Sequence, residues 1–146
     1  MKLFSLSLVA CLAVLPLTNV IAQSNLIVGE WLNEEKDGKV AIYQEGELFY
    51  GKISWLEDAT NEDGTARKDD NNPNVDLQNK ALDGLVILKD FIYNESEDEW
   101  KGGKIYDPKN GKTYSCYMKM TGEKLKIRGF VMGMRAFGRT TYWTGN

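Results

Sequence analysis

The sequence is 146 residues long and carries 18 basic residues against 21 acidic ones, a formal net charge of −3, with no histidine. A negative chain repels polyphosphate, so nucleic acid is not expected as a partner. Without histidine, the Ser-His-Asp and Cys-His catalytic groups are excluded, as are zinc sites that use imidazole.

The N-terminus has the pattern of a cleavable signal peptide over residues 1–22. Lys2 is a positive start, Leu3 to Leu17 is almost entirely apolar, and Val20-Ile21-Ala22 fits a cleavage site. The apolar run is shorter than the roughly 20 residues of a membrane-spanning helix, so no transmembrane segment is expected. The chain is therefore predicted to be exported, to the periplasm or the extracellular space. Lipoprotein anchoring through Cys11 is the alternative, because Leu8-Val9-Ala10-Cys11 resembles a lipobox.

Cleavage after Ala22 would leave residues 23–146, which is enough chain for one domain with one core. Export permits disulfides, yet this part of the chain has one cysteine, Cys116, so its stability is expected to come from packing. Cys116 lies in an alternating stretch, residues 114–118. It is interpreted as a small buried hydrophobe and not as a reactive thiol.

Short alternating segments separated by turn residues predict that the domain is almost entirely β. Glu45-Gly46-Glu47, Asp107–Gly111 and Thr121-Gly122-Glu123 have the composition of tight turns. Gly102-Gly103 is interpreted as a bulge or a close packing contact, since no helix follows it to form a phosphate loop. Eight strands are predicted, over Ile27–Asn33, Val40–Gln44, Leu48–Leu56, Leu85–Lys89, Trp100–Tyr106, Lys112–Met120, Lys124–Val131 and Arg139–Thr144.

Eight strands in chain order predict an all-β fold, a single antiparallel up-and-down barrel, because closure removes exposed strand edges. A β-sandwich is the alternative. Such a barrel has room for its own side chains or for one small ligand. Strand parity predicts two inward faces, Tyr114, Cys116, Met118 and Met120 on one strand and Leu125, Ile127, Gly129 and Val131 on the next.

Residues 57–81 form one long acidic connection with few large apolar side chains, and they are predicted to be a loop. Part of this loop approaches calcium-binding spacing, but Ala59 stands at the first ligand position and Asp70 at the position of the bidentate glutamate. No metal or cofactor is therefore predicted, although the oxygen-rich run 69–74 leaves weak metal binding open. A second acidic run, residues 94–99, is predicted to be a solvated turn.

Gly29-Glu30-Trp31, together with Arg139 and Trp143 near the end of the chain, resembles the signature of lipocalin-like and other calycin barrels. In those families the first-strand Trp closes one end of the barrel beneath an Arg from near the last strand. The resemblance implies a barrel-closing contact between Trp31 and Arg139.

A longer set of residues carries a second resemblance, namely Asn72-Pro73, Gly84-Leu85, Trp100–Pro108, Gly111–Tyr114, Leu125–Gly129, Arg139-Thr140 and Trp143. Together they resemble the secreted bacterial family known as domain of unknown function 2147. Gln78-Asn79 stands where that family often has an Arg-Asn pair, which puts any role of that Arg in doubt. The family has no established activity, so the resemblance implies an exported barrel without implying a mechanism.

Three functions are consistent with these features. The first is binding of a small apolar or amphipathic molecule in a barrel mouth lined by Trp55, Tyr106, Tyr114 and Met118, unless these side chains simply fill the core. The second is an interaction module that docks on another envelope protein through its outer face or its acidic loop. The third, ranked last, is a carboxylate-dependent hydrolase. No acid pair stands out, so the chain is expected not to be an enzyme and no catalytic residue is named.

Overall fold

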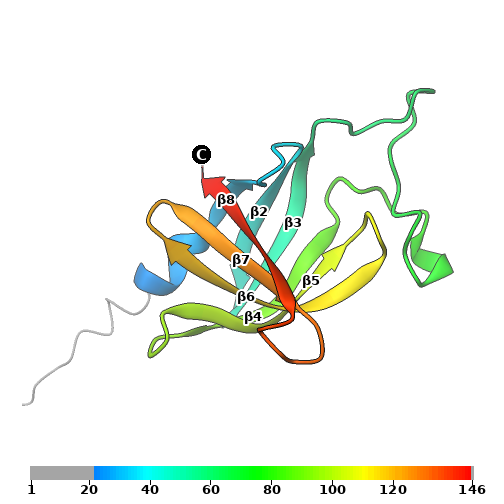
Figure 1. Cartoon of the computed structure of the whole chain (residues 1–146). Helices are drawn as coiled ribbons and strands as arrows, with labels where there is room; N and C mark the ends of the chain where they lie inside the picture. The colour runs from blue at the N-terminus through cyan, green and yellow to red at the C-terminus, as the bar shows by residue number, and fades with distance from the viewer. Residues whose placement is uncertain (1–21, 146) are drawn as a thin grey trace, which may run out of the picture.

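The computed structural model describes residues 22–145 and shows a closed barrel of eight antiparallel strands in chain order (Figure 1). The predicted signal peptide lies outside the described residues apart from Ala22, and so does Cys11. In residues 22–145, no helix is long and apolar enough to cross a membrane. The strands are β1 (Gly29–Leu32), β2 (Gly38–Glu45), β3 (Leu48–Leu56), β4 (Val86–Asn94), β5 (Glu99–Asp107), β6 (Lys112–Thr121), β7 (Lys124–Phe130) and β8 (Gly138–Gly145).

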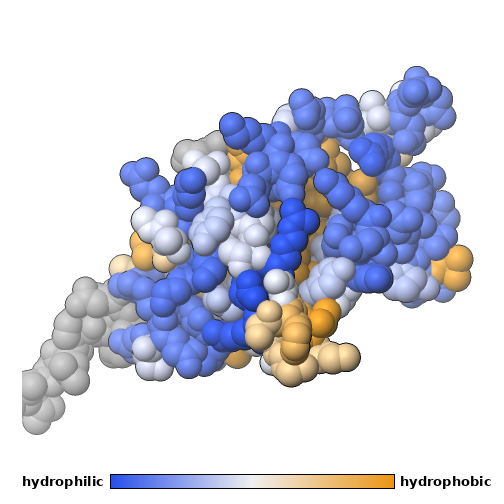
Figure 2. All heavy atoms as spheres, in the orientation of Figure 1, coloured by the Kyte–Doolittle hydropathy of each residue, from blue (hydrophilic) through white to orange (hydrophobic). Residues whose placement is uncertain are grey.

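A short seam between the first and last strands closes the barrel. Trp31 pairs with Gly145, and Leu32 pairs with Thr144. Because both borders of the sheet are paired, the predicted barrel is confirmed and the alternative sandwich is wrong. The face shown in Figure 2 is mainly hydrophilic and includes an apolar patch over the β7–β8 loop.

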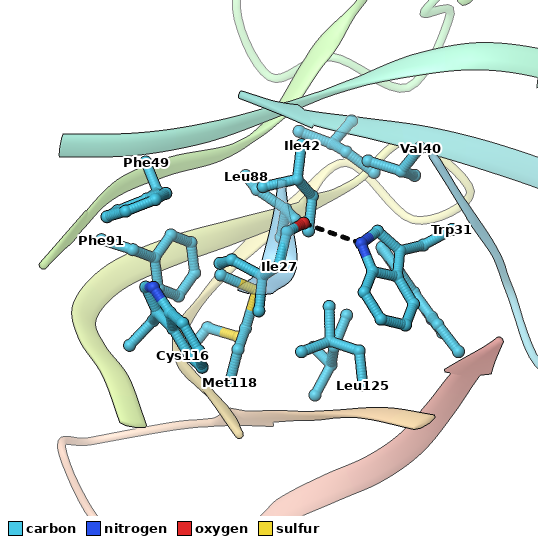
Figure 3. Packing of buried hydrophobic residues seen from close by; sticks show 14 of the residues in the cluster. Ile27, Trp31, Val40, Ile42, Phe49, Leu88, Phe91, Cys116, Met118 and Leu125 are labelled. Carbon is cyan, nitrogen blue, oxygen red and sulfur yellow. Dashed lines mark hydrogen bonds between the residues drawn. The ribbon is translucent and has the colours of Figure 1, made fainter. Parts of the chain in front are cut away.

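The N-terminal segment closes one end of the barrel from inside. Asn25–Ile27 form the 3-10 helix η1, and Ile27 is fully buried among side chains of several strands (Figure 3). The Trp31 indole donates to the Ile27 carbonyl at 2.8 Å, and the Trp100 indole donates to the Ser24 carbonyl at 3.0 Å. The prediction that a strand begins at Ile27 is wrong, because the chain turns inward to bury Ile27 before β1 begins.

Large side chains fill the half of the barrel next to this N-terminal cap. The ring of Phe91 lies directly over Gly103, where a Cβ atom would overlap with the ring. Gly102 has a φ of 79° and lies at an irregularity in the β5–β6 register. The two glycines therefore provide a bulge and a close contact, as predicted. The side chains that fill this half, each at most 1% exposed, include Phe49, Phe91, Trp100, Met118 and Leu125.

The inward faces predicted for β6 and β7 are confirmed except at one end. Cys116, Met118, Leu125 and Ile127 are buried, and Met120 packs against them. Burial raises the pKa of the Cys116 thiol to about 12, which leaves it protonated and unreactive at neutral pH. The prediction for Val131 is wrong, because β7 ends at Phe130 and Val131 is 45% exposed in the loop that follows.

The long connection between β3 and β4 runs outside the barrel (Figure 1). Thr60 pairs with Ala66 and Lys68 with Ala81 as isolated bridges, and Val75–Leu77 form the 3-10 helix η2. Across residues 22–145, no three carboxylate or thiol side chains gather closely enough to hold a metal ion.

Asp69 anchors this connection to the barrel. Its carboxylate is 1% exposed and accepts hydrogen bonds from the Tyr106 hydroxyl and the Asn72 side-chain amide, both at 2.7 Å. Asn71, the next residue but one, donates to the carbonyls of Pro108 and Lys109 in the β5–β6 turn. These bonds hold the connection beside one end of the barrel.

Glu99 is a second buried carboxylate, at the start of β5. It is 4% exposed and forms an ion pair with Arg135 at 2.5 Å. The prediction of a solvated turn over residues 94–99 is therefore wrong at Glu99, because the β7–β8 loop folds back over the outer face of the barrel and covers it.

We expect Ile27→Ala to lower the free energy of unfolding by about 2–5 kcal/mol, since it removes buried methyl groups and leaves a cavity beneath the cap. Leu26→Ala is the matched control, because Leu26 is 53% exposed and its truncation should change stability by less than about 0.5 kcal/mol. Chemical denaturation of both variants measures the difference. Equal losses would contradict the role assigned to Ile27.

Tyr106→Phe tests the anchor of the long connection. Burial and the hydrogen bond to Asp69 raise the pKa of Tyr106 to about 12. A tyrosine whose pKa is raised on folding stabilises the fold fully below its unfolded pKa, about 10, and this stability is lost as pH rises toward 12. We expect the tyrosinate titration of Tyr106→Phe to lose one ionisation near pH 12 and the loop to be cleaved faster by protease.

Tyr93 is the control for this experiment, because burial and a hydrogen bond to Asp98 also raise its pKa to about 12. Tyr93→Phe should remove one late ionisation without exposing residues 57–81. Identical protease sensitivity of the two variants would show that the Tyr106–Asp69 bond does not hold the loop.

Candidate functional site

The half of the barrel farther from the cap is hollow. A cavity of ≈ 480 Å³ opens between the β1–β2, β5–β6 and β7–β8 loops, which lie at the opposite end from the cap. The packed half forms its floor. Its walls are apolar side chains from six strands, namely Val40, Ile53, Ile87, Ile105, Ile127 and Trp143.

Gly129 enlarges this cavity. It occupies an inward position of β7 and lines the cavity wall. A Cβ atom placed there would lie 3.5 Å from the Ile105 side chain and 3.6 Å from that of Tyr114, which are ordinary contact distances. Backbone geometry therefore does not require glycine at this position, and its missing side chain leaves open space.

Thr141 brings one polar group to the apolar wall. It lies on β8 and lines the cavity, and its hydroxyl oxygen is buried without a hydrogen-bond partner. In the described residues, Ser54 is the other side chain with such an atom. A buried hydroxyl without a partner costs free energy, which a bound polar group would recover.

Charged side chains surround the mouth and pair across it. Glu35 binds Arg139 at 3.2 Å, and Asp37 binds Lys109 at 3.1 Å. The pKa of Asp37 is lowered, mainly by a hydrogen bond from the Asn33 side chain; burial opposes this shift, and Lys109 adds to it. The side chains of Arg139 and Lys109 are 78% and 72% exposed, so each pair contributes little to stability and opens at little cost.

Of the four predicted ligand-binding residues, two line the cavity, one lies in the packed half of the barrel and one lies on its outside. Tyr106 and Tyr114 line the cavity, and the Tyr114 hydroxyl accepts from the Asn110 side chain at 3.0 Å. The Tyr106 hydroxyl is bound to Asp69, so it supports the rim from outside. Met118 lies in the packed half, at 1% exposed, and does not line the cavity.

Trp55 does not line the cavity, and its prediction as a mouth residue is wrong. It is 42% exposed on the outside of the barrel. Lys39 pairs with Trp55 while Val40 pairs with Ile53, so Ser54 is an extra residue in β3. This bulge reverses the alternation, with the result that Leu56 lines the cavity in place of Trp55.

The contact implied between Trp31 and Arg139 does not form. Trp31 pairs with Gly145 at the end of β8, whereas Arg139 pairs with Gly129 near its start. Six residues of strand separate the two positions, about 20 Å at the usual rise per residue. Trp31 is buried beside the cap, and Arg139 lines the mouth with its guanidinium on Glu35.

Sequence reasoning did not identify the six apolar wall residues as parts of a ligand site. It also did not identify Gly129 and Thr141 as cavity residues. Strand parity was the available signal for them, because it placed Ile127 and Gly129 on the inward face of β7. Parity does not say which inward residues fill the core and which face open space. That distinction depends on the cap, which fills only one half.

A second hollow lies outside the barrel, between the long connection and β3–β6. It is an open groove of ≈ 820 Å³. Its walls mix acids such as Asp83 and Asp90 with bases such as Lys80 and Lys89. With no consistent charge or apolar character, it is a weaker candidate for a ligand site than the barrel cavity.

The comparisons with known proteins agree with this architecture. No curated protein matches the chain. In its fold the chain is similar to a solved structure described as protein HP1028 from the human pathogen Helicobacter pylori, which belongs to the lipocalin family. The similarity has a TM-score of 0.72 and 26% sequence identity, and it covers 82% of each chain.

Residues 29–145 match the family model described as an uncharacterized protein conserved in bacteria, DUF2147. The matched segment contains all eight strands of the barrel. The chain therefore belongs to the DUF2147 family, and its fold is a lipocalin-like barrel.

Proposed function

We propose that the barrel binds a small apolar or amphipathic molecule in the cavity at its open end. The observation that carries this proposal is a one-ended cavity of ≈ 480 Å³ with apolar walls from six strands. Ligand sites generally have volumes of about 300–1,000 Å³ and are mostly apolar with a few polar groups. The similar structure is described as a lipocalin, which supports the proposal through the shared fold.

The polar groups of the cavity favour an amphipathic ligand over a hydrocarbon. Thr141 offers a hydroxyl without a partner in the wall, and Asn33, Lys109 and Arg139 lie at the mouth. An apolar portion of the ligand would lie against the isoleucines. Its polar end would reach the rim, where the exposed ion pairs open easily.

We further propose that the protein is exported through the leader at residues 1–22 and acts in the bacterial envelope. The charged start, the apolar run and Ala22 support this. Mass spectrometry of protein recovered from the native envelope should give a chain that begins at Gln23. A chain that begins at a lipid-modified Cys11 would instead establish the lipoprotein alternative, and an intact leader would contradict export.

Gly129→Leu tests the ligand site. The added side chain should occupy the cavity without backbone strain, so the affinity for the apolar fluorophore N-phenyl-1-naphthylamine should fall at least about tenfold, as expected for a blocked apolar site. Gly129→Ala is the matched control, because its Cβ meets only ordinary contacts and should leave affinity nearly unchanged.

Thr141→Leu provides a second obstruction from β8 if Gly129→Leu perturbs folding, which thermal unfolding would reveal. Fluorophore binding that persists equally in both leucine variants would place the ligand outside the barrel. Native mass spectrometry of protein from its own envelope adds an independent measurement, and a copurified molecule is the expected result.

A further inference from the structure

Charge is divided unevenly between two parts of the barrel. Residues 112–145, which form β6, β7 and β8 with their connections, carry seven lysines and arginines against one acid, Glu123. Residues 22–111 carry ten basic and twenty acidic residues. Because β6, β7 and β8 are neighbours in the barrel, the basic residues form one positive side on a negative protein.

Two of these lysines face each other without an acid between them. Lys119 on β6 and Lys126 on β7 are directly paired across the strands. Like charges in this position destabilise a sheet. The Lys119 ammonium donates to the Glu97 carbonyl, and the Lys126 ammonium lies over the Tyr117 ring at 5.7 Å, so neither has a carboxylate partner among the ion pairs of residues 22–145. An external anionic surface would relieve this repulsion.

The loop between β7 and β8 adds an apolar patch to the same side, visible as the orange area at the bottom of Figure 2. Every residue from 131 to 139 is exposed. The patch consists of Val131, Met132, Met134 and Phe137, which are 45%, 85%, 44% and 60% exposed. A cluster of large apolar side chains on a protein surface marks an interaction site.

Polar contacts beneath the loop hold this patch outward. Arg128 donates to the carbonyls of Arg135 at 2.7 Å and Ala136 at 3.3 Å. Arg135 in turn pairs with the buried Glu99 at 2.5 Å and lies 4.1 Å from the centre of the Tyr117 ring. Two carbonyls of the loop are thus satisfied on its inner side, and the apolar side chains of the patch stay exposed.

We propose that this face docks on a lipid bilayer with anionic head groups, with Met132 and Met134 inserted among the acyl chains. Exposed apolar side chains on the same side of a protein as lysines without a carboxylate partner are a combination that binds such an interface, because burial and charge attraction add. Val131 and Phe137 also line the barrel cavity, so the inserted patch is continuous with the candidate ligand site. Docking would place the cavity mouth beside the membrane.

The test is cosedimentation of the chain from Gln23, which contains every element of the barrel, with phosphatidylcholine vesicles prepared with or without phosphatidylglycerol. We expect binding to the anionic vesicles, weakened by salt, and little binding to phosphatidylcholine alone. Met132→Ser with Met134→Ser, two patch residues that do not line the cavity, should weaken binding at least about tenfold. Lys119→Gln with Lys126→Gln should weaken it by about fivefold for each charge removed, and only on anionic vesicles.

Val75→Ser with Ile92→Ser is the matched control, because these residues are 72% and 54% exposed away from the patch and should bind vesicles as the unmodified chain does. The proposal is overturned if the unmodified chain ignores anionic vesicles or if the patch variant binds them equally well. It is also overturned if the control variant loses as much binding as the patch variant.

This inference does not depend on the proposed ligand site. Patch variants should still bind N-phenyl-1-naphthylamine in solution, and Gly129→Leu should still bind vesicles. Loss of one activity without the other identifies which of the two proposals fails.

Discussion

Two indole hydrogen bonds hold the N-terminal segment inside the barrel, and the shape of the interior depends on them. Trp31 and Trp100 come from different strands and donate to the carbonyls of Ile27 and Ser24. A buried N–H group without a partner costs about 1–3 kcal/mol. The N-terminal segment therefore satisfies both indoles, and the indoles in turn hold the segment in place. With Ile27 fixed at one end, the barrel is closed at that end and open at the other.

Side-chain size then decides which half of the barrel interior is filled. Phe49, Phe91 and Trp100 gather near the cap, where Gly103 makes room for a ring. Toward the mouth the wall changes to isoleucines, and Gly129 contributes no side chain. An eight-stranded barrel has little spare interior, so a few residues determine whether it contains a cavity at all. The same few residues determine how large a ligand the cavity admits.

The strand pattern could be predicted from the sequence because alternation and turn residues are local signals. The bulge at Ser54 has no such signal, so Trp55 was placed on the wrong side of β3. The burial of Asp69 and Glu99 depends on Tyr106 and Arg135, which lie 37 and 36 residues away along the chain. The local sequence of an acidic loop does not show whether a distant residue will bind and bury one of its carboxylates. The seam, the cavity and the basic side likewise arise only when distant strands become neighbours.

The seam between β1 and β8 also means that the barrel can close only after the whole chain has been synthesised. Trp31 cannot pair with Gly145 until the eighth strand has been synthesised, so the ring of strands cannot be completed while the ribosome still holds that strand. Contacts between residues so far apart in sequence form slowly compared with those of helical proteins. Such a chain stays open for longer after synthesis. Under the export proposed above, the chain would therefore still be open when it reaches a translocation pore.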